Sequence, residues 1–114
     1  ACTILFNNEP VRSCLMLAPQ IDNGEITTIE GISENSTYND LREAFKKYHA
    51  LQCGYCTPGF LTTIVYLLEK KQYLSDEEIR KKLSGNICRC TGYTGIIKAV
   101  KEVMANRFKR SIND

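Results

Sequence analysis

Two close pairs of cysteines constrain this chain more than any other feature. Cys53 and Cys56 form a C-x2-C pair, Cys88 and Cys90 form a C-x-C pair, and residues 57–87 separate the two pairs. Glycines lie beside both pairs, which is typical of short loops that bring several thiolates to one metal centre. The spacing therefore predicts a metal site, not a packing role, for these four cysteines.

The spacing by itself leaves the metal open. Four thiolates can hold zinc, a single iron ion or an iron–sulfur cluster, and ligand softness does not separate these alternatives. Structural zinc sites usually have C-x2-C or wider spacing on both sides, whereas a C-x-C pair can place one thiolate on each side of an iron. A redox-active C-x2-C is disfavoured because no strand–helix pattern precedes Cys53, and two disulfides are disfavoured because no secretory context is visible. From the spacing alone, a zinc site and an iron–sulfur site are therefore nearly equally favoured.

Length and charge narrow the classes of function. The 114 residues predict one compact domain, or a small domain with an appendage. Fifteen Lys and Arg against thirteen Asp and Glu give a net charge of +2, which offers no electrostatic case for a nucleic-acid or membrane-surface partner. The longest apolar run, 64–68, is far too short to span a bilayer. Six cysteines without a recognisable secretion signal favour a reducing, cytoplasmic location.

The N-terminal part has β character. β-Branched and aromatic residues in 2–14 lie on both sides of the Asn7-Asn8 dipeptide, which predicts a hairpin. Residues 25–30 predict a further strand, and the polar stretch 33–38 is interpreted as a linker. So few and such short strands form only a marginal sheet by themselves.

Helical periodicity begins after residue 38. We expect Asn39 and Thr57 to cap the first two helices, with Pro58 in the first turn of the second, and a capping box at 75–78 to open the third. Four helices are predicted, over 39–49, 57–68, 75–83 and 96–108. Apolar residues cover more than one face of the second helix, so it should be central in the core.

The pattern of helix, cysteine pair and helix occurs twice. We therefore predict a mainly α protein in which 39–108 form a four-helix domain, with a pseudo-two-fold axis through the metal site, followed by a polar tail at 109–114. In each half a helix begins just after the cysteine pair and directs its unpaired N–H groups and positive dipole end towards the thiolates. Arg89 adds a cation between two of them. Four glycines lie near the cysteines, and close backbone approach or positive φ is plausible at each, although a cap or turn role explains Gly85 better: Gly54, Gly59, Gly85 and Gly92.

Two segments carry a specific family resemblance. Residues 50–59 (ALQCGYCTPG) and 83–93 (LSGNICRCTGY) resemble the iron–sulfur subunit of molybdenum hydroxylases of the xanthine dehydrogenase and carbon monoxide dehydrogenase type. The surroundings of Cys2 and Cys14 resemble the last part of that family's plant-type ferredoxin domain, so the resemblance runs from residue 1 to about residue 100.

The resemblance implies a [2Fe-2S] cluster in the helical domain, held by Cys53, Cys56, Cys88 and Cys90, and it reduces zinc to a minor alternative. It also implies that Gln52 and Cys90 approach the molybdopterin.

The N-terminal cysteines match only part of a second site. A plant-type [2Fe-2S] site has the pattern C-x4-C-x2-C followed by a distant fourth cysteine. Cys2 and Cys14 fit the third and fourth positions, so 1–32 are expected to be the incomplete C-terminal part of a β-grasp ferredoxin-like domain. The sequence as given is thus expected to hold one complete cluster site, and a second only where an upstream segment supplies two more ligands.

The resemblance implies electron transfer: a subunit that relays electrons from a molybdopterin centre in a large subunit towards an FAD-binding medium subunit. No residue suggests catalysis by this chain alone, and His49, its one histidine, is expected to have a packing or capping role. The alternative function is a four-cysteine zinc module that holds helices together without redox activity.

Overall fold

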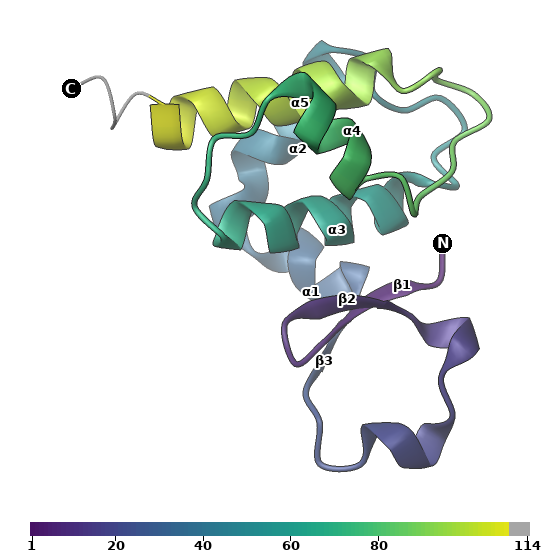
Figure 1. Cartoon of the computed structure of the whole chain (residues 1–114). Coiled ribbons are helices and arrows are strands. Elements are labelled where there is room, and N and C mark those ends of the chain that lie inside the picture. The colour runs from purple at the N-terminus through teal and green to yellow at the C-terminus, as the bar shows by residue number, and fades with distance from the viewer. Residues whose placement is uncertain (110–114) are drawn as a thin grey trace.

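A small antiparallel sheet lies at one side of a larger group of helices (Figure 1). The computed structural model describes residues 1–109. Its strands β1 (Thr3–Phe6), β2 (Glu9–Arg12) and β3 (Ile26–Thr27) pair in the order β2–β1–β3. The predicted hairpin is confirmed: Asn7 and Asn8 join β1 to β2, and both have positive φ, as a two-residue type I′ turn requires.

The segment between the sheet and the main helices is more helical than predicted. The strand predicted over 25–30 is wrong beyond Thr27, because α1 (Ile29–Glu34) begins two residues later. A 3-10 turn, Ser36–Tyr38, follows it. The stretch interpreted as a linker, 33–38, is therefore mostly helical, and it buries the Tyr38 side chain in the core.

All four predicted helices are present: α2 (Asn39–Lys47), α3 (Thr57–Glu69), α4 (Asp76–Lys82) and α5 (Thr94–Met104), the last continued by a π turn, Ala105–Lys109. The capping box is confirmed, since Ser75 Oγ accepts from the Glu78 N–H and the Glu78 carboxylate accepts from the Ser75 N–H, both at 3.2 Å. The caps predicted at Asn39 and Thr57 are wrong by one position, because these residues are the first of their helices. The predicted polar tail comprises residues 109–114, of which 110–114 lie outside the residues that the structure describes.

Helix α3 is central, as predicted. It packs on one side against β1, β2 and α1, and Figure 1 shows it between the sheet and the α4–α5 layer. Phe60 and Ile64 are fully buried along it, while α2 and α4 both pack against α5. Within the described part of the chain, every helix falls short of the length and apolar character that crossing a bilayer requires.

The helix directions bring both cysteine loops to one end of the molecule. The chain leaves α2 into residues 48–56 and leaves α4 into residues 83–93, and these loops lie together at the right-hand side of Figure 1. Gly95 allows the start of α5 to approach the end of α2, since a Cβ at this position would lie 2.5 Å from the Tyr48 carbonyl oxygen. The start of α5 therefore lies directly against the start of the 48–56 loop.

Candidate metal centre

The thiols of the four cysteines meet across the two loops. Cys53 Sγ lies 3.6 Å from Cys90 Sγ. The Cys56 and Cys88 thiols hydrogen-bond to one another. In space the thiols therefore form two new pairs, Cys53–Cys90 and Cys56–Cys88, and each loop contributes one thiol to each of them.

This arrangement fits a two-iron core better than a single zinc ion. Two thiolates about 2.3 Å from one tetrahedral metal ion lie about 3.8 Å apart, close to the Cys53–Cys90 separation. A [2Fe-2S] core is held by four thiolates, two on each iron. The two separate thiol pairs, Cys53–Cys90 and Cys56–Cys88, match this division. The zinc alternative is thus the poorer geometric fit.

Polar groups close to the sulfurs come from tight turns. Gly54 and Gly92 have φ of 82° and 68°, so the positive φ suggested for glycines near the thiols occurs at these two positions. Both the Thr91 hydroxyl (3.1 Å) and the Thr91 N–H (3.4 Å) donate to Cys88 Sγ, and the Tyr55 N–H donates to Cys53 Sγ at 3.5 Å. Such donors stabilise negative charge on sulfur.

The Cys88 and Cys56 thiols differ in acidity. Burial opposes ionisation of Cys88, but the hydrogen bonds from Thr91 outweigh it and lower the pKa of Cys88 to about 7. Burial, together with the hydrogen bond to Cys88, raises the pKa of Cys56 to about 11. The hydrogen bond with Cys53 raises the pKa of Cys90. Metal ions bind thiolates, so metal binding would release the protons that these thiols carry.

A buried hydroxyl without a hydrogen-bond partner lies next to Cys56 in the chain. Thr57 Oγ1 is buried and has no hydrogen-bond partner within the described residues. It follows Cys56 directly, in the first turn of α3, where the helix dipole favours negative charge. A sulfur-rich anionic group at the thiols would offer an acceptor to this hydroxyl, so the donor set and its surroundings fit a [2Fe-2S] cluster.

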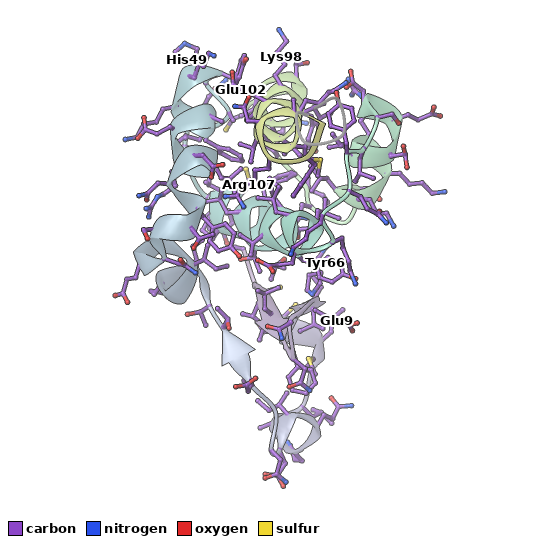
Figure 2. All side chains as sticks on the ribbon, turned by 90° about the vertical axis from the view of Figure 1, so that its left-hand side faces the viewer. Glu9, His49, Tyr66, Lys98, Glu102 and Arg107 are labelled. Atoms are coloured by element: carbon purple, nitrogen blue, oxygen red, sulfur yellow. The ribbon has the colours of Figure 1, made fainter. Side chains whose placement is uncertain are left out.

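The remaining predicted site residues lie at the surface. Gln52 and Cys90 are both exposed, as a contact with a cofactor of another subunit would require, and Arg89 is exposed between Cys88 and Cys90. His49 lies beyond the end of α2 with a positive φ of 52°, at the top of Figure 2.

Cys2 and Cys14 form a third thiol pair. The register of β1 and β2, with Thr3 opposite Arg12, brings their sulfurs to 3.2 Å. The N–H of Cys14 lowers the pKa of Cys2, and the hydrogen bond with Cys2 raises the pKa of Cys14. The structure therefore brings the two cysteines together, close enough to contact one metal ion.

Sequence reasoning missed several residues that shape the centre. The Cys88 N–H donates to Tyr93 Oη at 2.9 Å, and the Tyr93 ring packs edge-to-face against Phe60. Thr91 could have been noticed, because a hydroxyl residue directly after the C-x-C pair can reach a sulfur. Nothing local pointed to Arg12, which donates to the Gly85 carbonyl oxygen from the other end of the chain.

Comparisons with known proteins agree with this geometry. The model of the "[2Fe-2S] binding domain" family matches residues 28–101. Caffeine dehydrogenase subunit gamma of Pseudomonas sp. (strain CBB1) is 50% identical over 106 residues, which are 90% of this chain and 64% of that protein. The xanthine dehydrogenase iron-sulfur-binding subunit of Escherichia coli O157:H7 is 40% identical over 102 residues, which are 88% of this chain and 64% of that protein. The chain thus spans just under two thirds of these curated relatives.

A solved structure extends the match to the fold. The crystal structure of quinoline 2-oxidoreductase from Pseudomonas putida 86 superposes with a TM-score of 0.84 and 44% identity, over 96% of this chain and 68% of that one. Fold and thiol geometry together define an iron–sulfur protein. The chain belongs to the [2Fe-2S] binding domain family and carries a [2Fe-2S] cluster, and its relatives include the iron–sulfur-binding subunit of xanthine dehydrogenase. The family prediction is confirmed.

Proposed function

We propose that this chain transfers electrons within a molybdenum hydroxylase, from a molybdopterin centre in a large subunit towards an FAD-binding subunit, in the cytoplasm. The observation that carries the proposal is the pairing of four thiols across two loops in a domain of this family. When bound, a [2Fe-2S] cluster accepts and returns one electron at a time.

In this proposal each residue near the centre has a defined part. Cys53, Cys56, Cys88 and Cys90 hold the cluster. The Thr91 and Tyr55 donors stabilise negative charge on the ligand sulfurs, and the first turn of α3 adds its positive dipole end. Gln52 and Cys90 are proposed to face the molybdopterin, in keeping with their exposure.

The N-terminal part has a second role in the proposal. Cys2 and Cys14 are two of the four ligands of a plant-type cluster, and 1–32 are the C-terminal part of its ferredoxin-like domain. Residues 39–108 form the helical cluster domain, joined to it through 33–38. The two halves α2–loop–α3 and α4–loop–α5 are related by an approximate two-fold axis; the supporting observation is that each loop supplies one thiol to each pair.

The ligand assignment is tested by replacing each of Cys53, Cys56, Cys88 and Cys90 with serine in turn. We expect each variant to lose visible absorption, iron and acid-labile sulfide, because every thiolate occupies one of four coordination positions. Ser84→Ala, in the same loop as Cys88, is the matched control and should keep the wild-type spectrum. A variant that retains iron and an unchanged spectrum removes that cysteine from the site.

Metal and sulfide analysis of the purified protein distinguishes electron transfer from the structural zinc module. A red-brown protein that contains iron and sulfide supports electron transfer, whereas a colourless protein with stoichiometric zinc supports the structural module. The direction of transfer is tested in the assembled enzyme by the order in which the molybdenum, iron–sulfur and flavin signals change after substrate is added. Flavin reduction before any change in the iron–sulfur signals would contradict the relay.

A further inference from the structure

A small apolar pocket lies beside the loop that carries Cys88 and Cys90. Its volume is about 240 Å³, and its walls come from α3, α4, α5 and the 83–93 loop. Ile87 is one of the lining residues and is 80% exposed, although isoleucine is among the residue types most often buried. The other apolar lining residues include four buried side chains: Phe60, Leu83, Ile96 and Ile97. The pocket thus combines a buried apolar floor with a solvent-exposed apolar edge.

Further apolar side chains are exposed on the other cysteine loop. Leu51 and Tyr55, on either side of Cys53, are both exposed. The two loops lie together at one end of the molecule (Figure 1), so Ile87, Leu51 and Tyr55 are exposed at the same end as the thiols. Singly exposed apolar residues are ordinary, whereas apolar side chains exposed together mark surfaces that bind another protein.

Positive charge lies in the two segments that form this pocket. Arg80 lines the pocket, Lys81 and Lys82 follow it in the last turn of α4, and Arg89 lies in the cysteine loop. All four residues are exposed, and within residues 1–109 none of the four side chains forms a hydrogen bond or an ion pair. The dipole of α4 favours cations in its last turn, but it does not account for Arg89, which lies outside the helices.

The carboxylates of α4 offset little of this charge. Asp76 pairs with Lys101 of α5 at 2.9 Å, and Glu78 belongs to the capping box. Within the described part of the chain, Glu77 alone is left on this helix to offset the four cations. The surface around the pocket is therefore complementary to an acidic partner.

We infer that this pocket is a docking site for an acidic segment of the molybdopterin-binding large subunit, which inserts an apolar side chain beside Ile87 and places carboxylates against Arg80 and Arg89. This inference rests on the proposed function, in which the exposed Cys90 faces the molybdopterin. Cys90 and Ile87 belong to the same short loop, so a subunit that reaches Cys90 also reaches the pocket. The apolar anchor supplies affinity, and the cations steer the association.

The test measures binding of the full-length, cluster-loaded subunit to the separately purified large subunit by surface plasmon resonance. Ile87→Asp places a charge at the apolar edge and should weaken binding by about thirtyfold, the loss typical of an interface anchor, mainly through faster dissociation. Arg80→Glu, on α4 and outside the cysteine loop, should slow association. It should also make the association rate less dependent on salt, because salt screens the attraction that this substitution removes.

The matched controls carry the same substitutions elsewhere. Ile26→Asp changes an exposed isoleucine on β3, and Lys71→Glu reverses an exposed charge beyond the end of α3, the helix that begins at the thiols. Both should bind the large subunit as the wild type does. Visible spectra of all variants show whether the cluster is intact.

The inference is overturned if Arg80→Glu keeps the wild-type association rate and salt dependence, or if Ile87→Asp keeps the wild-type affinity with an unchanged spectrum. It is equally overturned if Lys71→Glu changes association as much as Arg80→Glu does. Variants that lose self-association or binding to the flavin subunit, but bind the large subunit normally, would assign the pocket to another occupant and contradict the inference. A cluster-loaded wild-type subunit that fails to bind the large subunit would contradict the proposed function itself.

Discussion

At the scale of single residues, Tyr93 shows how the cysteine loops keep their shape. It is a non-glycine residue with φ of 73°, an uncommon conformation, and it stands directly before α5. Its hydroxyl accepts from the N–H of Cys88, a residue only 6% exposed, so the side chain satisfies a donor that water reaches poorly. The strained backbone is thus compensated by contacts that orient a proposed ligand.

Tyr93→Phe should therefore destabilise the folded chain. The ring and its contact with Phe60 remain, but the Cys88 N–H loses its acceptor, and leaving such a group unsatisfied costs about 1–3 kcal/mol. Denaturant unfolding of the cluster-loaded protein measures the change. Tyr55→Phe is the control, since Tyr55 is 77% exposed and should change stability by less than about 0.5 kcal/mol. Equal effects of the two substitutions would mean that the Tyr93 hydroxyl contributes nothing.

At the scale of elements, α3 connects the two layers of the fold. It packs against the sheet and α1 on one side, and Figure 1 shows the α4–α5 layer on its other side, which explains why no polar stripe runs along it. Thr62 and Thr63 are buried on this helix, and their hydroxyls are satisfied by the carbonyl oxygens of Pro58 and Gly59 one turn earlier. The helix thus buries these two threonines with both of their hydroxyls paired.

Ile64→Asp should disrupt this element. Ile64 is fully buried, and an uncompensated charge in the core costs about 3–5 kcal/mol. Thermal unfolding followed by circular dichroism should show a large loss of stability, or an unfolded protein. Ile26→Asp is matched in chemistry but lies on β3 with 44% of the residue exposed, so its effect should be much smaller. If Ile64→Asp melted like the wild type, α3 could not be central.

At the scale of the whole molecule, a network of charged and polar side chains joins α2, α3 and the turn after α5 at the end remote from the thiols. Arg107, in the π turn after α5, donates from Nε and Nη2 to the Asp40 carboxylate at 2.8 and 2.7 Å, and it lies among α2, α3 and α5 in Figure 2. Its guanidinium also packs over the Tyr38 ring, whose hydroxyl donates to Glu69 at the end of α3. Burial, together with the bond to Glu69, raises the pKa of Tyr38 to about 12.

This network predicts a pH-dependent part of the stability. The hydrogen bonds from Arg107 hold the pKa of Asp40 below its usual value, so the folded state favours the ionised carboxylate. The stabilisation is fully present above the unfolded-state pKa, which is about 4, and is lost as the pH falls through the lower folded-state value. Unfolding free energies of the wild type and of Asp40→Asn, measured from neutral pH downwards, should differ most at neutral pH and converge in acid.

Asp22→Asn, at an exposed position between β2 and β3, is the control and should follow the wild-type curve. A difference between the wild type and Asp40→Asn that stayed constant with pH would show that the ionised carboxylate is not the stabilising group.

Much of the fold follows from local patterns. Apolar residues repeating with the helical period of 3.6 residues predicted the positions of all four main helices. The Ser75 capping box opens α4 as predicted, and Asn7 and Asn8 form the hairpin turn. These features depend on interactions within a few residues, which the sequence displays directly. The polar composition of 33–38 was misleading, because Tyr38 packs against distant residues such as Arg107, which lies 69 positions further along the chain.

The sequence by itself thus determined the helices, the hairpin, the family and the candidate ligands, whose role as ligands stays a prediction. Only the tertiary structure decided how the thiols pair, with Cys53 beside Cys90 and Cys56 beside Cys88. It also decided that Arg12 lies on the Gly85 carbonyl. The reason is physical: such contacts join groups tens of residues apart, and they depend on how α2, α3, α4 and α5 pack against one another, which no short pattern encodes.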